Sequence, residues 1–473
     1  MTNSTLPVST SDPTQRSRFW LLLFIATPGI VVIIYLAYVL YLRHIFATCP
    51  PDCQRADLAH ADLSGRDWAG ADLSEADLSN ALLQNSTLAE AKLVFANLSG
   101  ANLTGANLQN ANLRGALLAG ANLTQADLSG AELSGARIFN ADLSQADLRG
   151  AWAKAADFSG AQLTGTLIDD QTFLEAKWRL VWQIVNQPNA ARDLRGADLS
   201  GAYLAGVDLQ HANLQHAILS KTNLAGADLS QANLEYALLL QADIDESTQL
   251  SPQWRLVWEI LNQVRTERTL ENADLSRANL HAAFLREANL AGADLREALL
   301  QEADLRRALL RGADLTQANL TEAILRAADL QNADLRAANL AGVDLSLANL
   351  RGALIDENTI MLPTWRTVWS ILNQGGADRE LSQRVLDYAD LAGADLQHAN
   401  LSGAHLDHAN LAGANLAGAN LQGATLAAAE LQDADLTNAN LTNANLNRAQ
   451  MAGAKLDGAI LDGAVLPQND TSP

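Results

Sequence analysis

Aromatic residues are scarce in this chain, at only 5% of its 473 residues. So few rings argue against an ordinary globular core, although 48% of the residues are hydrophobic, mostly Leu and Ala. Basic residues are also short, since 32 Lys and Arg face 53 Asp and Glu. A formal charge of −21 argues against direct nucleic-acid binding through a basic patch. A cationic partner, mimicry of DNA's own charge, or simple solubility remain as reasons for this acidity.

Cysteine occurs only twice, at Cys49 and Cys53 in the stretch CPPDC. The pair would close a local disulfide in an oxidising compartment and stay as two thiols in the cytosol. A metal site needs more ligands than the nearby His44 and His60 supply. We therefore predict a Cys49–Cys53 disulfide if this part of the chain is exported, and no metal site.

Charge is absent from residues 19–42, FWLLLFIATPGIVVIIYLAYVLYL. As a helix rising ~1.5 Å per residue, this run is about 36 Å long, which exceeds the ~30 Å hydrocarbon core of a membrane. The run is too long for a signal peptide, and no small-residue cleavage site follows it. We predict a single transmembrane helix at 19–42, between an N-terminal tail at 1–18 and a linker at 43–54 that holds both cysteines.

An apolar residue recurs every five positions from Leu58 onward, and a small residue, usually Ala, stands two places before it. An α-helix would scatter this pattern, because five residues turn through about 500°. A straight strand would flip each successive apolar side chain to the opposite face. The leucines converge only if the chain turns a corner every five residues, at the polar pair that follows each of them. The period therefore predicts a β-solenoid with coils stacked about 4.8 Å apart.

The pattern A-[DN]-L-[STRQ]-[GNX] covers the chain from Arg55 to Leu466 and resembles the pentapeptide-repeat family. The resemblance implies an all-β fold, a right-handed quadrilateral β-helix with four pentapeptides per coil. Leu or Phe would fill the centre, with the small residue beside it and the Asp or Asn facing outward. The repeats fall into four blocks, at 55–168, 192–244, 268–356 and 379–466, followed by a tail at 467–473.

The blocks are separated by three joints, at 169–191, 245–267 and 357–378, and each joint holds a near-copy of one decamer. The copies are WRLVWQIVNQ, WRLVWEILNQ and WRTVWSILNQ. In the first copy, Trp178, Val181, Trp182 and Val185 form the apolar stripe of a short helix. So short a helix needs burial, either against a coil end or against a partner. The candidate interaction residues are Trp178, Trp182, Trp254, Trp258, Trp365 and Trp369.

Residues for catalysis do not stand out, because the repeat itself places Asp or Asn before nearly every central Leu. Histidines are dispersed and glycines fall at corners, so we predict no enzyme activity, no catalytic residue and no cofactor. One departure is a set of arginines in the third block, Arg286, Arg306 and Arg326, at 20-residue intervals. With 20 residues per coil they would stack on one face. They are either ordinary partners of nearby glutamates or a charged strip for a polar partner.

These features predict a non-enzymatic, membrane-anchored β-helical scaffold that binds an unidentified protein partner. The resemblance extends to anchored cyanobacterial members with Trp-containing joints, which implies a role in envelope organisation. It also implies the main alternative, a DNA-mimicking regulator of a type II topoisomerase, although a membrane anchor argues against that role. No closing helix follows Leu466, so we also expect homo-oligomers through the C-terminal coil.

Flanking charge and the cysteines bear on which side of the membrane holds the repeats. Arg16 and Arg18 precede the apolar run, whereas Arg43 and His44 follow it, which slightly favours a cytoplasmic N-terminus. The cysteines favour an oxidising compartment for the repeats. We therefore expect a single-pass protein of a bacterial plasma or thylakoid membrane, with its repeats on the periplasmic or lumenal side.

Overall fold

The computed structural model describes residues 51–187 and 192–467 of the chain. The chain divides into two compact units, Met1–Gln187 and Pro188–Pro473. The predicted membrane helix at 19–42 and Cys49 lie outside the described residues. Within those two described ranges, no helix is both long and apolar enough to cross a membrane.

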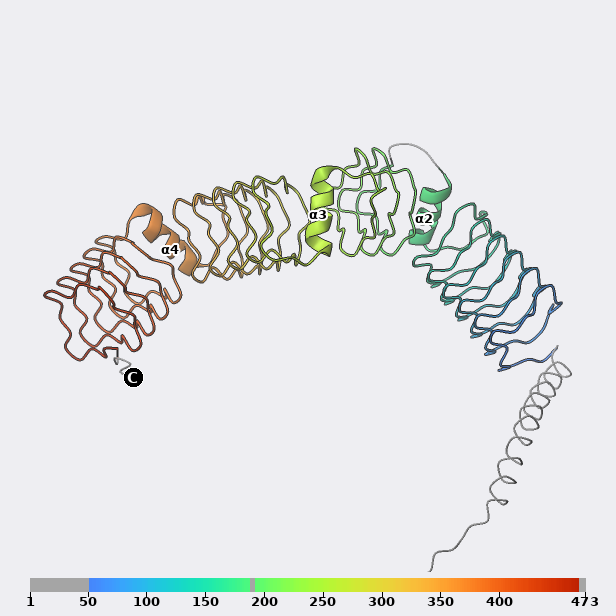
Figure 1. Ribbon diagram of the computed structural model, residues 1–473, viewed down its shortest axis with the longest axis horizontal. Helices are drawn as coiled ribbons and strands as arrows, with labels where there is room; N and C mark the ends of the chain where they lie inside the picture. Colours follow the sequence, from blue (N-terminus) through green and yellow to red (C-terminus); the bar gives the residue numbers. More distant parts are fainter. Residues whose placement is uncertain (1–50, 188–191, 468–473) are drawn as a thin grey trace, which may run out of the picture. The chain divides into compact units, whose positions relative to one another are not determined.

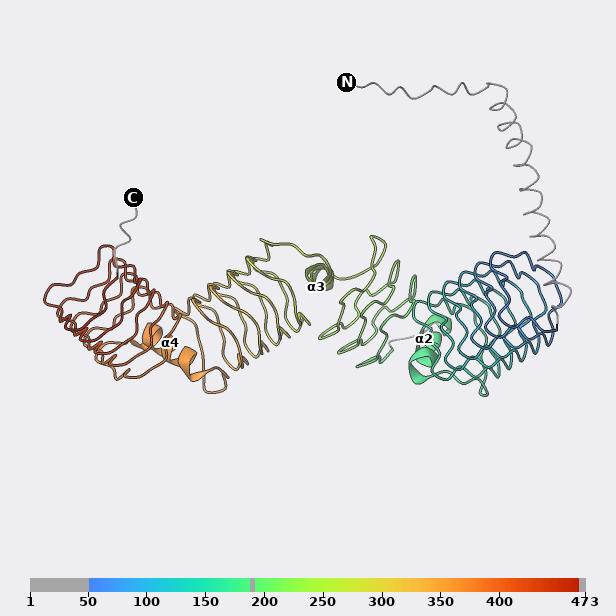
Figure 2. The same cartoon turned by 90° about the horizontal axis from the view of Figure 1, so that it is seen from below.

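Short parallel β-bridges between residues twenty positions apart build the structure. Asp57 pairs with Asp77, Asp77 pairs with Asn97, and the same step recurs along the described chain. Each coil of twenty residues therefore holds four pentapeptides, and its edges stack on those of the next coil (Figure 1 and Figure 2). The bridges form four ladders in the described residues, from Asp52 to Phe173, Asp193 to Gln249, Thr269 to Ile360 and Glu380 to Val465.

Central residues and the small residues beside them form the core of every ladder. Leu83 and Leu98 are fully buried, as are the alanines two places before them. The residue just before a central position points outward instead, so Leu82 is 40% exposed beside the fully buried Leu83. Backbone bonds join the coils, for example from the Leu58 N–H to the Asp77 carbonyl at 2.7 Å. A buried Leu contributes about 1.5–3 kcal/mol, so stability is spread along each ladder.

The corners explain why Asp or Asn precedes each central residue. The Asp62 Oδ1 accepts a hydrogen bond from the Ser64 N–H at 3.1 Å, which fixes the start of the corner. Asp and Asn are the side chains short enough to bond the backbone two residues on. The next corner residue is left-handed, as at Asn80 and Gly100. A Cβ on Gly100 would lie 2.5 Å from the Asn80 side chain one coil earlier, which explains a glycine there.

The first three ladders end with a corner that is one residue longer than the others. Their last bridges step by 21 residues and join Trp152 to Phe173, Asp228 to Gln249 and Asn339 to Ile360. The first ladder therefore continues beyond Ile168, into residues that the sequence assigns to the joint. The last coil of the first ladder therefore leads into the helix that follows it with almost no linker.

An Asp-x-x-Thr turn builds this longer corner. In the first ladder, Asp169 Oδ1 accepts hydrogen bonds from the Thr172 N–H at 2.9 Å and the Gly150 N–H at 3.0 Å. The Thr172 hydroxyl donates to the Leu148 carbonyl at 3.0 Å, one coil earlier. The turn recurs at Asp245–Thr248 and Asp356–Thr359.

A short helix follows each longer corner. The helices in the described residues are α2 (Ala176–Asn186), α3 (Pro252–Asn262) and α4 (Pro363–Gln374). Pro252 and Pro363 occupy the first turn of their helices, where a missing backbone N–H costs nothing.

The buried face of each helix differs from the predicted stripe. On α2, Trp178, Val181 and Ile184 are buried, whereas Trp182 and Val185 are only half-buried. The predicted stripe is therefore wrong at Val185 and misses Ile184. The helix is rotated because the second tryptophan lies at the flank of the stripe, where its indole N–H reaches a backbone carbonyl.

Two adjacent leucines test which side of the chain forms the core. We expect Leu83→Ala to lower the free energy of unfolding by about 2–5 kcal/mol, because it leaves a cavity between stacked coils. Leu82→Ala removes the same atoms from an outward, 40% exposed side chain and should cost about 0.5 kcal/mol or less. Urea and thermal unfolding of the two variants give the comparison. Equal losses would contradict the inward orientation of the central position.

The Asp-x-x-Thr turn predicts a pH dependence of stability. Bonds from the Ser247 hydroxyl and the Gly226 N–H lower the pKa of Asp245 to about 2, below its usual 3.8. A lowered carboxyl pKa contributes stability that is complete above about pH 4 and is lost as the pH falls toward 2. Asp245→Asn keeps an acceptor oxygen but not the charge. We expect its melting temperature to lie below that of the wild type at pH 7 and the gap to close between about pH 4 and 2.

The matched control for this titration is Glu246→Gln, which removes one charge from the adjacent exposed residue. Melting curves recorded by circular dichroism at steps of pH give the measurement. A gap for Asp245→Asn that stays constant down to pH 2, or an equal gap for Glu246→Gln, would contradict the assigned role of the Asp245 carboxylate.

Candidate functional site

The joint helices depart most from the repeat, and each lies across the last coil of the ladder before it (Figure 1). On α2 the indole of Trp178 lies 6.1 Å, centroid to centroid, from the ring of Phe158, a central residue of the first ladder. Trp178 is 6% exposed, and Trp254 and Trp365 at the same helix position are each 8% exposed. These three candidate residues therefore close the apolar end of a ladder and offer little surface to a partner.

The second tryptophan of each helix donates a hydrogen bond to a backbone carbonyl of the last coil. In the middle of a ladder, the next coil would bond that carbonyl. Trp182 is half-buried, and its Nε1–H donates to the Thr166 carbonyl at 2.7 Å. The equivalent bonds run from Trp258 to the Ala242 carbonyl at 2.7 Å and from Trp369 to the Ala353 carbonyl at 2.6 Å. These three candidates are thus also held by the ladder that they cover.

An asparagine near the end of each helix completes the cover. Asn186 Nδ2–H donates to the Leu163 carbonyl at 2.9 Å, while its Oδ1 accepts from the Gly165 N–H at 2.6 Å. One side-chain amide thereby satisfies a donor and an acceptor of the open coil, as a further coil would. Asn262 and Asn373 bond the second and third ladders in the same way. The sequence shows this Asn in all three decamers, and its invariance there is the signal that could have revealed it.

The arginine that follows the first tryptophan joins the helix to the Asp-x-x-Thr turn. Arg255 Nη2 donates to the Thr248 carbonyl at 2.6 Å, and Arg366 Nη2 donates to the Thr359 carbonyl at 2.5 Å. Arg179 makes the same bond to Thr172. Turn, helix and coil end thus form one connected unit at each joint.

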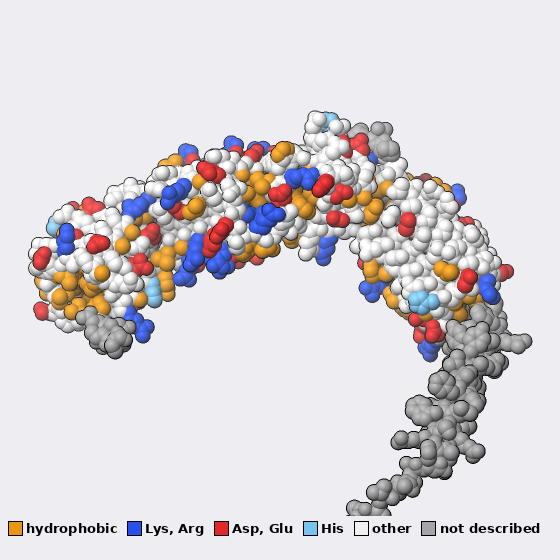
Figure 3. Space-filling model, in the orientation of Figure 1, with side chains coloured by type: hydrophobic (Ala, Val, Ile, Leu, Met, Phe, Trp, Pro, Cys, Tyr) orange, Lys and Arg blue, Asp and Glu red, His pale blue; other side chains and the backbone are white. Residues whose placement is uncertain are grey.

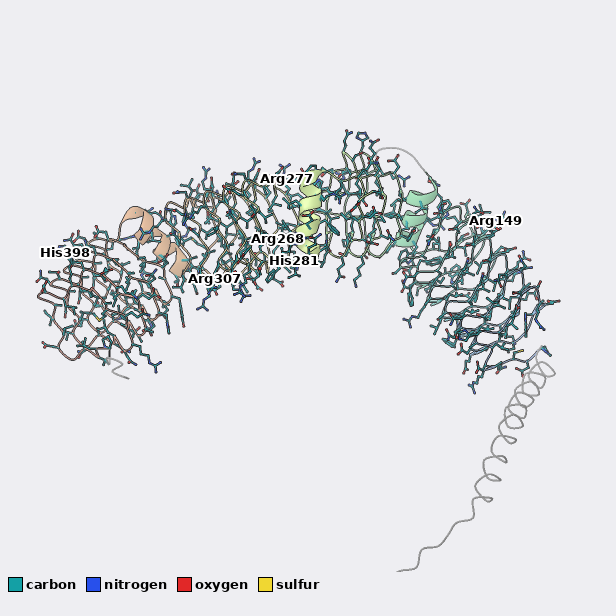
Figure 4. All side chains as sticks on the ribbon, viewed as in Figure 1. Arg149, Arg268, Arg277, His281, Arg307 and His398 are labelled. Atoms are coloured by element: carbon teal, nitrogen blue, oxygen red, sulfur yellow. The ribbon has the colours of Figure 1, made fainter. Side chains whose placement is uncertain are left out.

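A second arginine, at the small position that opens the next ladder, bonds the end of the helix. Arg268 is buried beside α3 (Figure 4), where it donates to the Glu259 carbonyl at 3.1 Å and to the Gln263 carbonyl. Burial lowers the pKa of Arg268, and the carbonyls at a helix C-terminus favour a cation. Arg379 Nη1 likewise donates to the Gly375 carbonyl at 3.2 Å.

Polar contacts also join the second ladder to the third beside α3. The Tyr236 hydroxyl donates to Glu297 at 2.8 Å, and Arg277 (Figure 4) bonds Glu235 at 2.9 Å and Glu297 at 3.1 Å. Burial and the bond to Glu297 raise the pKa of Tyr236 to about 12. The Tyr236 N–H also bonds the Arg277 carbonyl at 2.8 Å. This cluster escaped sequence reasoning, because its members lie on opposite sides of a helix.

An equivalent contact joins the third ladder to the fourth beside α4. The Leu347 N–H donates to the Tyr388 carbonyl at 2.7 Å, and the Arg326 guanidinium lies 5.8 Å from the centre of the Tyr388 ring. His408 also stacks on the Tyr388 ring, with ring centroids 4.8 Å apart. Tyr236 and Tyr388 both occupy the left-handed corner position.

The three arginines predicted to form a strip all have partners within the protein. Arg306 bonds Asp304 at 2.8 Å through Nε, Arg286 lies 3.5 Å from Glu287, and Arg326 lies on Tyr388 as described. The bond from Arg306 is the main cause that lowers the pKa of Asp304. Exposed pairs of this kind contribute little stability each.

The same Asp-x-Arg pair recurs elsewhere and breaks up the negative surface. Arg296 Nε bonds Asp294 at 2.8 Å, and Arg336 Nε bonds Asp334 at 2.9 Å. Figure 3 shows Lys and Arg side chains interleaved with Asp and Glu over the ladder between α3 and α4. The outer surface of the third ladder is therefore of mixed charge.

Side chains that could bind a metal ion are dispersed in the described residues. No cluster there has three or more His, Cys, Asp or Glu side chains placed to hold a metal ion. His281 and His398 lie in different ladders (Figure 4). A shallow hollow along α4 is lined by Pro363, Arg366, Thr367, Trp369, Ser370 and Gln374. Neither a carboxylate nor a histidine lines it.

Cys53 occupies the central position of the first coil, five residues before Leu58. It is 3% exposed and disulfide-bonded. Cys49, the other cysteine of the sequence, lies outside the described residues, so the predicted Cys49–Cys53 pairing stays a prediction.

The fourth ladder ends differently from the other three. Its last central residues, Met451, Leu456 and Leu461, are only half-buried, and Leu466 is 46% exposed. Hydrophobic side chains gather at this end of the molecule (Figure 3), where no helix follows within the described residues. Among the residues up to 467 that the structure describes, nothing covers the apolar cross-section of this last coil.

In a comparison with protein-family models, the model described as pentapeptide repeats (8 copies) matches eleven stretches of this chain. The matches extend over well more than half of the chain and include most of each ladder. They cover residues 52–88, 81–118, 116–151, 131–168, 193–224, 222–248, 273–312, 288–326, 328–353, 389–426 and 429–466. A comparison with curated protein sequences found no match.

Solved structures similar to this chain are also pentapeptide repeat proteins. HetL, involved in heterocyst differentiation regulation in the cyanobacterium Nostoc sp. strain PCC 7120, is 26% identical; the match covers 68% of this chain and 98% of HetL, with a TM-score of 0.18. Rfr23 from the cyanobacterium Cyanothece 51142 is 26% identical over 28% of this chain and 97% of its own, with a TM-score of 0.21. QnrB1, a plasmid-mediated fluoroquinolone resistance protein, is 17% identical over 43% and 82%, with a TM-score of 0.19.

The asparagine of α4 tests whether the helix substitutes for a coil. We expect Asn373→Ala to expose the Gly352 amide to solvent and to lower its protection against hydrogen exchange by about 1–3 kcal/mol, because both partners lose their bond. Exchange measured by mass spectrometry on peptides that contain Gly352 reports the change. The control is Gln374→Ala at the neighbouring exposed residue. Unchanged protection in Asn373→Ala would show that the clamp does not hold the coil.

Proposed function

The chain belongs to the pentapeptide-repeat family, whose members fold as right-handed quadrilateral β-helices, and we propose that it is a non-enzymatic scaffold that presents its ladders to protein partners. The observation that carries this proposal is that the polar side chains of the repeat are used for structure. The outward Asp and Asn residues hold corners, the arginines pair with neighbours, and the helices cover ladder ends. What remains for a partner is the long outer surface of each ladder.

We propose that residues 19–42 anchor this scaffold in a membrane as a single-pass helix. Their freedom from charge and their length support the anchor. The disulfide at Cys53 supports an oxidising compartment for the ladders, which is the periplasmic or lumenal side of a bacterial plasma or thylakoid membrane. An anchored scaffold on that side suits the organisation of the envelope.

We propose further that the chain consists of four blocks of repeats related by duplication, with a helix as each joint. The repeated decamers and the repeated turn, clamp and arginine contacts support common descent of the joints. End-to-end pairing of two copies through the C-terminal coil is also compatible with the exposure of Leu466, but it ranks second to a helix of another protein as the occupant of that coil.

The alternative is a DNA-mimicking regulator of a type II topoisomerase, and the formal charge of −21 favours it. A mimic of duplex DNA needs regular rows of unpaired negative charge. The Asp-x-Arg pairs of the third ladder interrupt such rows. We therefore rank the alternative second.

The anchor is tested by a charge insertion in its centre. Val31→Arg with Ile33→Arg should move the chain from the membrane fraction to the soluble fraction, because each Arg at the centre of a membrane helix costs about 2.5–3.5 kcal/mol of insertion. Thr5→Arg with Ser9→Arg adds the same charge to the tail and should leave the chain in the membrane. Proteolysis of sealed vesicles then reports the side that holds the ladders.

Crosslinking in those vesicles identifies proteins bound along the ladders, and a purified type II topoisomerase provides the opposing test. Capture of a membrane or envelope protein supports the scaffold. A soluble wild-type chain that is retained by the topoisomerase would replace the scaffold with the alternative.

A further inference from the structure

The open C-terminal end of the fourth ladder is a second kind of interaction surface, distinct from the outer faces. We propose that it docks an amphipathic helix from another protein that carries the Trp-Arg-x-x-Trp-x-x-x-Asn pattern of α2, α3 and α4. This inference rests on the proposed role as an interaction scaffold and names the chemistry of one partner.

The first reason is that the same chain covers three ladder ends with this one helix type. In each case a buried tryptophan closes the apolar core, the second tryptophan bonds a carbonyl, and the asparagine bonds one N–H and one carbonyl. These side chains supply the bonds that the backbone of a further coil would supply. A ladder end thus specifies the pattern of the helix that fits it.

The second reason is that the open end presents the same groups in the same register. At the covered end of the third ladder, α4 bonds the Leu350 carbonyl, the Gly352 N–H and the Ala353 carbonyl. Residues 350–353 read LRGA, and residues 461–464 read LDGA, 111 residues later. The same interval separates Trp254 from Trp365. The described part of the fourth ladder ends at Val465, the counterpart of Leu354, which is one edge before the counterpart of Ile360.

In the fourth ladder these groups have no such partner among the described residues. The Leu461 carbonyl accepts only the turn bond from the Ala464 N–H, at 3.0 Å. The Gly463 N–H and the Ala464 carbonyl make no backbone hydrogen bond within residues 192–467. Free donors and acceptors at a sheet edge are a template for an added element.

The third reason is the apolar surface beside this edge. Under α4, the central residues Leu340, Leu345 and Leu350 are at most 1% exposed, and Ile355 is half-buried. At the open end, Leu466 is 46% exposed, and Met451, Leu456 and Leu461 are half-buried. A helix with Trp, Val and Ile on one face would cover these side chains as α4 covers the third ladder.

Acidic residues lie at the rim of the open end and favour a partner helix with a basic side chain. Asp457 and Asp462 are exposed at the corners of the last coil. The helices α2, α3 and α4 of a second copy are already packed on their own ladders, which makes them poor candidates for this site. We therefore assign the site to a helix of a different protein.

A labelled peptide with the sequence of residues 361–375, MLPTWRTVWSILNQG, tests the site against the purified full-length chain. We expect saturable binding, with one peptide per chain, by fluorescence anisotropy. Peptides with Asn373→Ala or Trp369→Phe should bind about tenfold more weakly, since each loses the hydrogen bonds of one side chain.

Two adjacent residues of the receptor give a matched pair of variants. Leu466→Glu places a charge in the apolar end and should abolish binding, whereas Val465→Glu on the outward face should leave binding unchanged, because the two side chains point in opposite directions. Both positions are about half exposed, so either change should allow folding, and circular dichroism checks it.

A self-covered chain supplies the decisive control. Residues 356–375 are appended directly after Leu466, in place of 467–473, so that a copy of α4 can cover the open end from within. We expect this chain to bind no peptide. No binding to the wild-type chain, or equal binding to the wild-type and self-covered chains, overturns the proposal.

Light scattering measures the oligomeric state and thereby shows whether a partner helix or a second copy of this chain occupies the open end. A wild-type dimer that becomes a monomer in the self-covered chain, without peptide binding to either, would assign this end to self-association and overturn the proposal. The scaffold itself fails on different evidence, namely the absence of crosslinked partners along the ladders.

Discussion

Each coil of a ladder leaves backbone N–H and C=O groups that point along the ladder axis, and only another coil, or something that imitates one, can bond them. The Leu58 N–H needs the Asp77 carbonyl one coil on, and the Asp77 N–H needs the Ala56 carbonyl one coil back. The apolar core stacks in the same direction. Every ladder end therefore needs partners for its backbone groups and a cover for its core. The other features of the chain follow from the ways in which these needs are met.

The joint helices bond these backbone groups with side chains, where a further coil would use its backbone. Each one supplies apolar residues for the core, an indole N–H and an amide for the edge, and an arginine for the turn before it. The repeated decamer, the Asp-x-x-Thr turn and the arginine that opens the next ladder therefore act together to cover a ladder end. Residues that looked like a docking face, such as Trp178, are used inside it.

The five-residue period was enough to predict the coil, its inward leucines and its outward Asp and Asn residues, because each pentapeptide depends mainly on its neighbours one coil away. The family model confirms the resemblance to the pentapeptide-repeat family.

The rotation of the helices was not predictable from apolar spacing alone. It depends on the hydrogen bond between the Trp182 indole and a backbone carbonyl, which places that tryptophan at the flank of the apolar stripe. Contacts such as Tyr236 with Arg277 join residues on either side of a helix, and no local pattern encodes their approach. The 20-residue spacing of the arginines matches one coil, but the spacing alone did not identify their partners. Arg306 bonds Asp304, and Arg326 lies on the Tyr388 ring.

All three helices cover the carboxyl side of the ladder that precedes them, which gives the molecule a polarity. Consider a gene segment that encodes one helix and the ladder that follows this helix. The segment starts and stops at equivalent positions of the repeat, so after its duplication or loss every internal ladder end is still covered by a helix. The number of ladders can then change during evolution one ladder at a time, without an intermediate form that exposes a new apolar ladder end within the chain. A segment cut anywhere else would leave a helix without a ladder to cover, or a ladder without its helix.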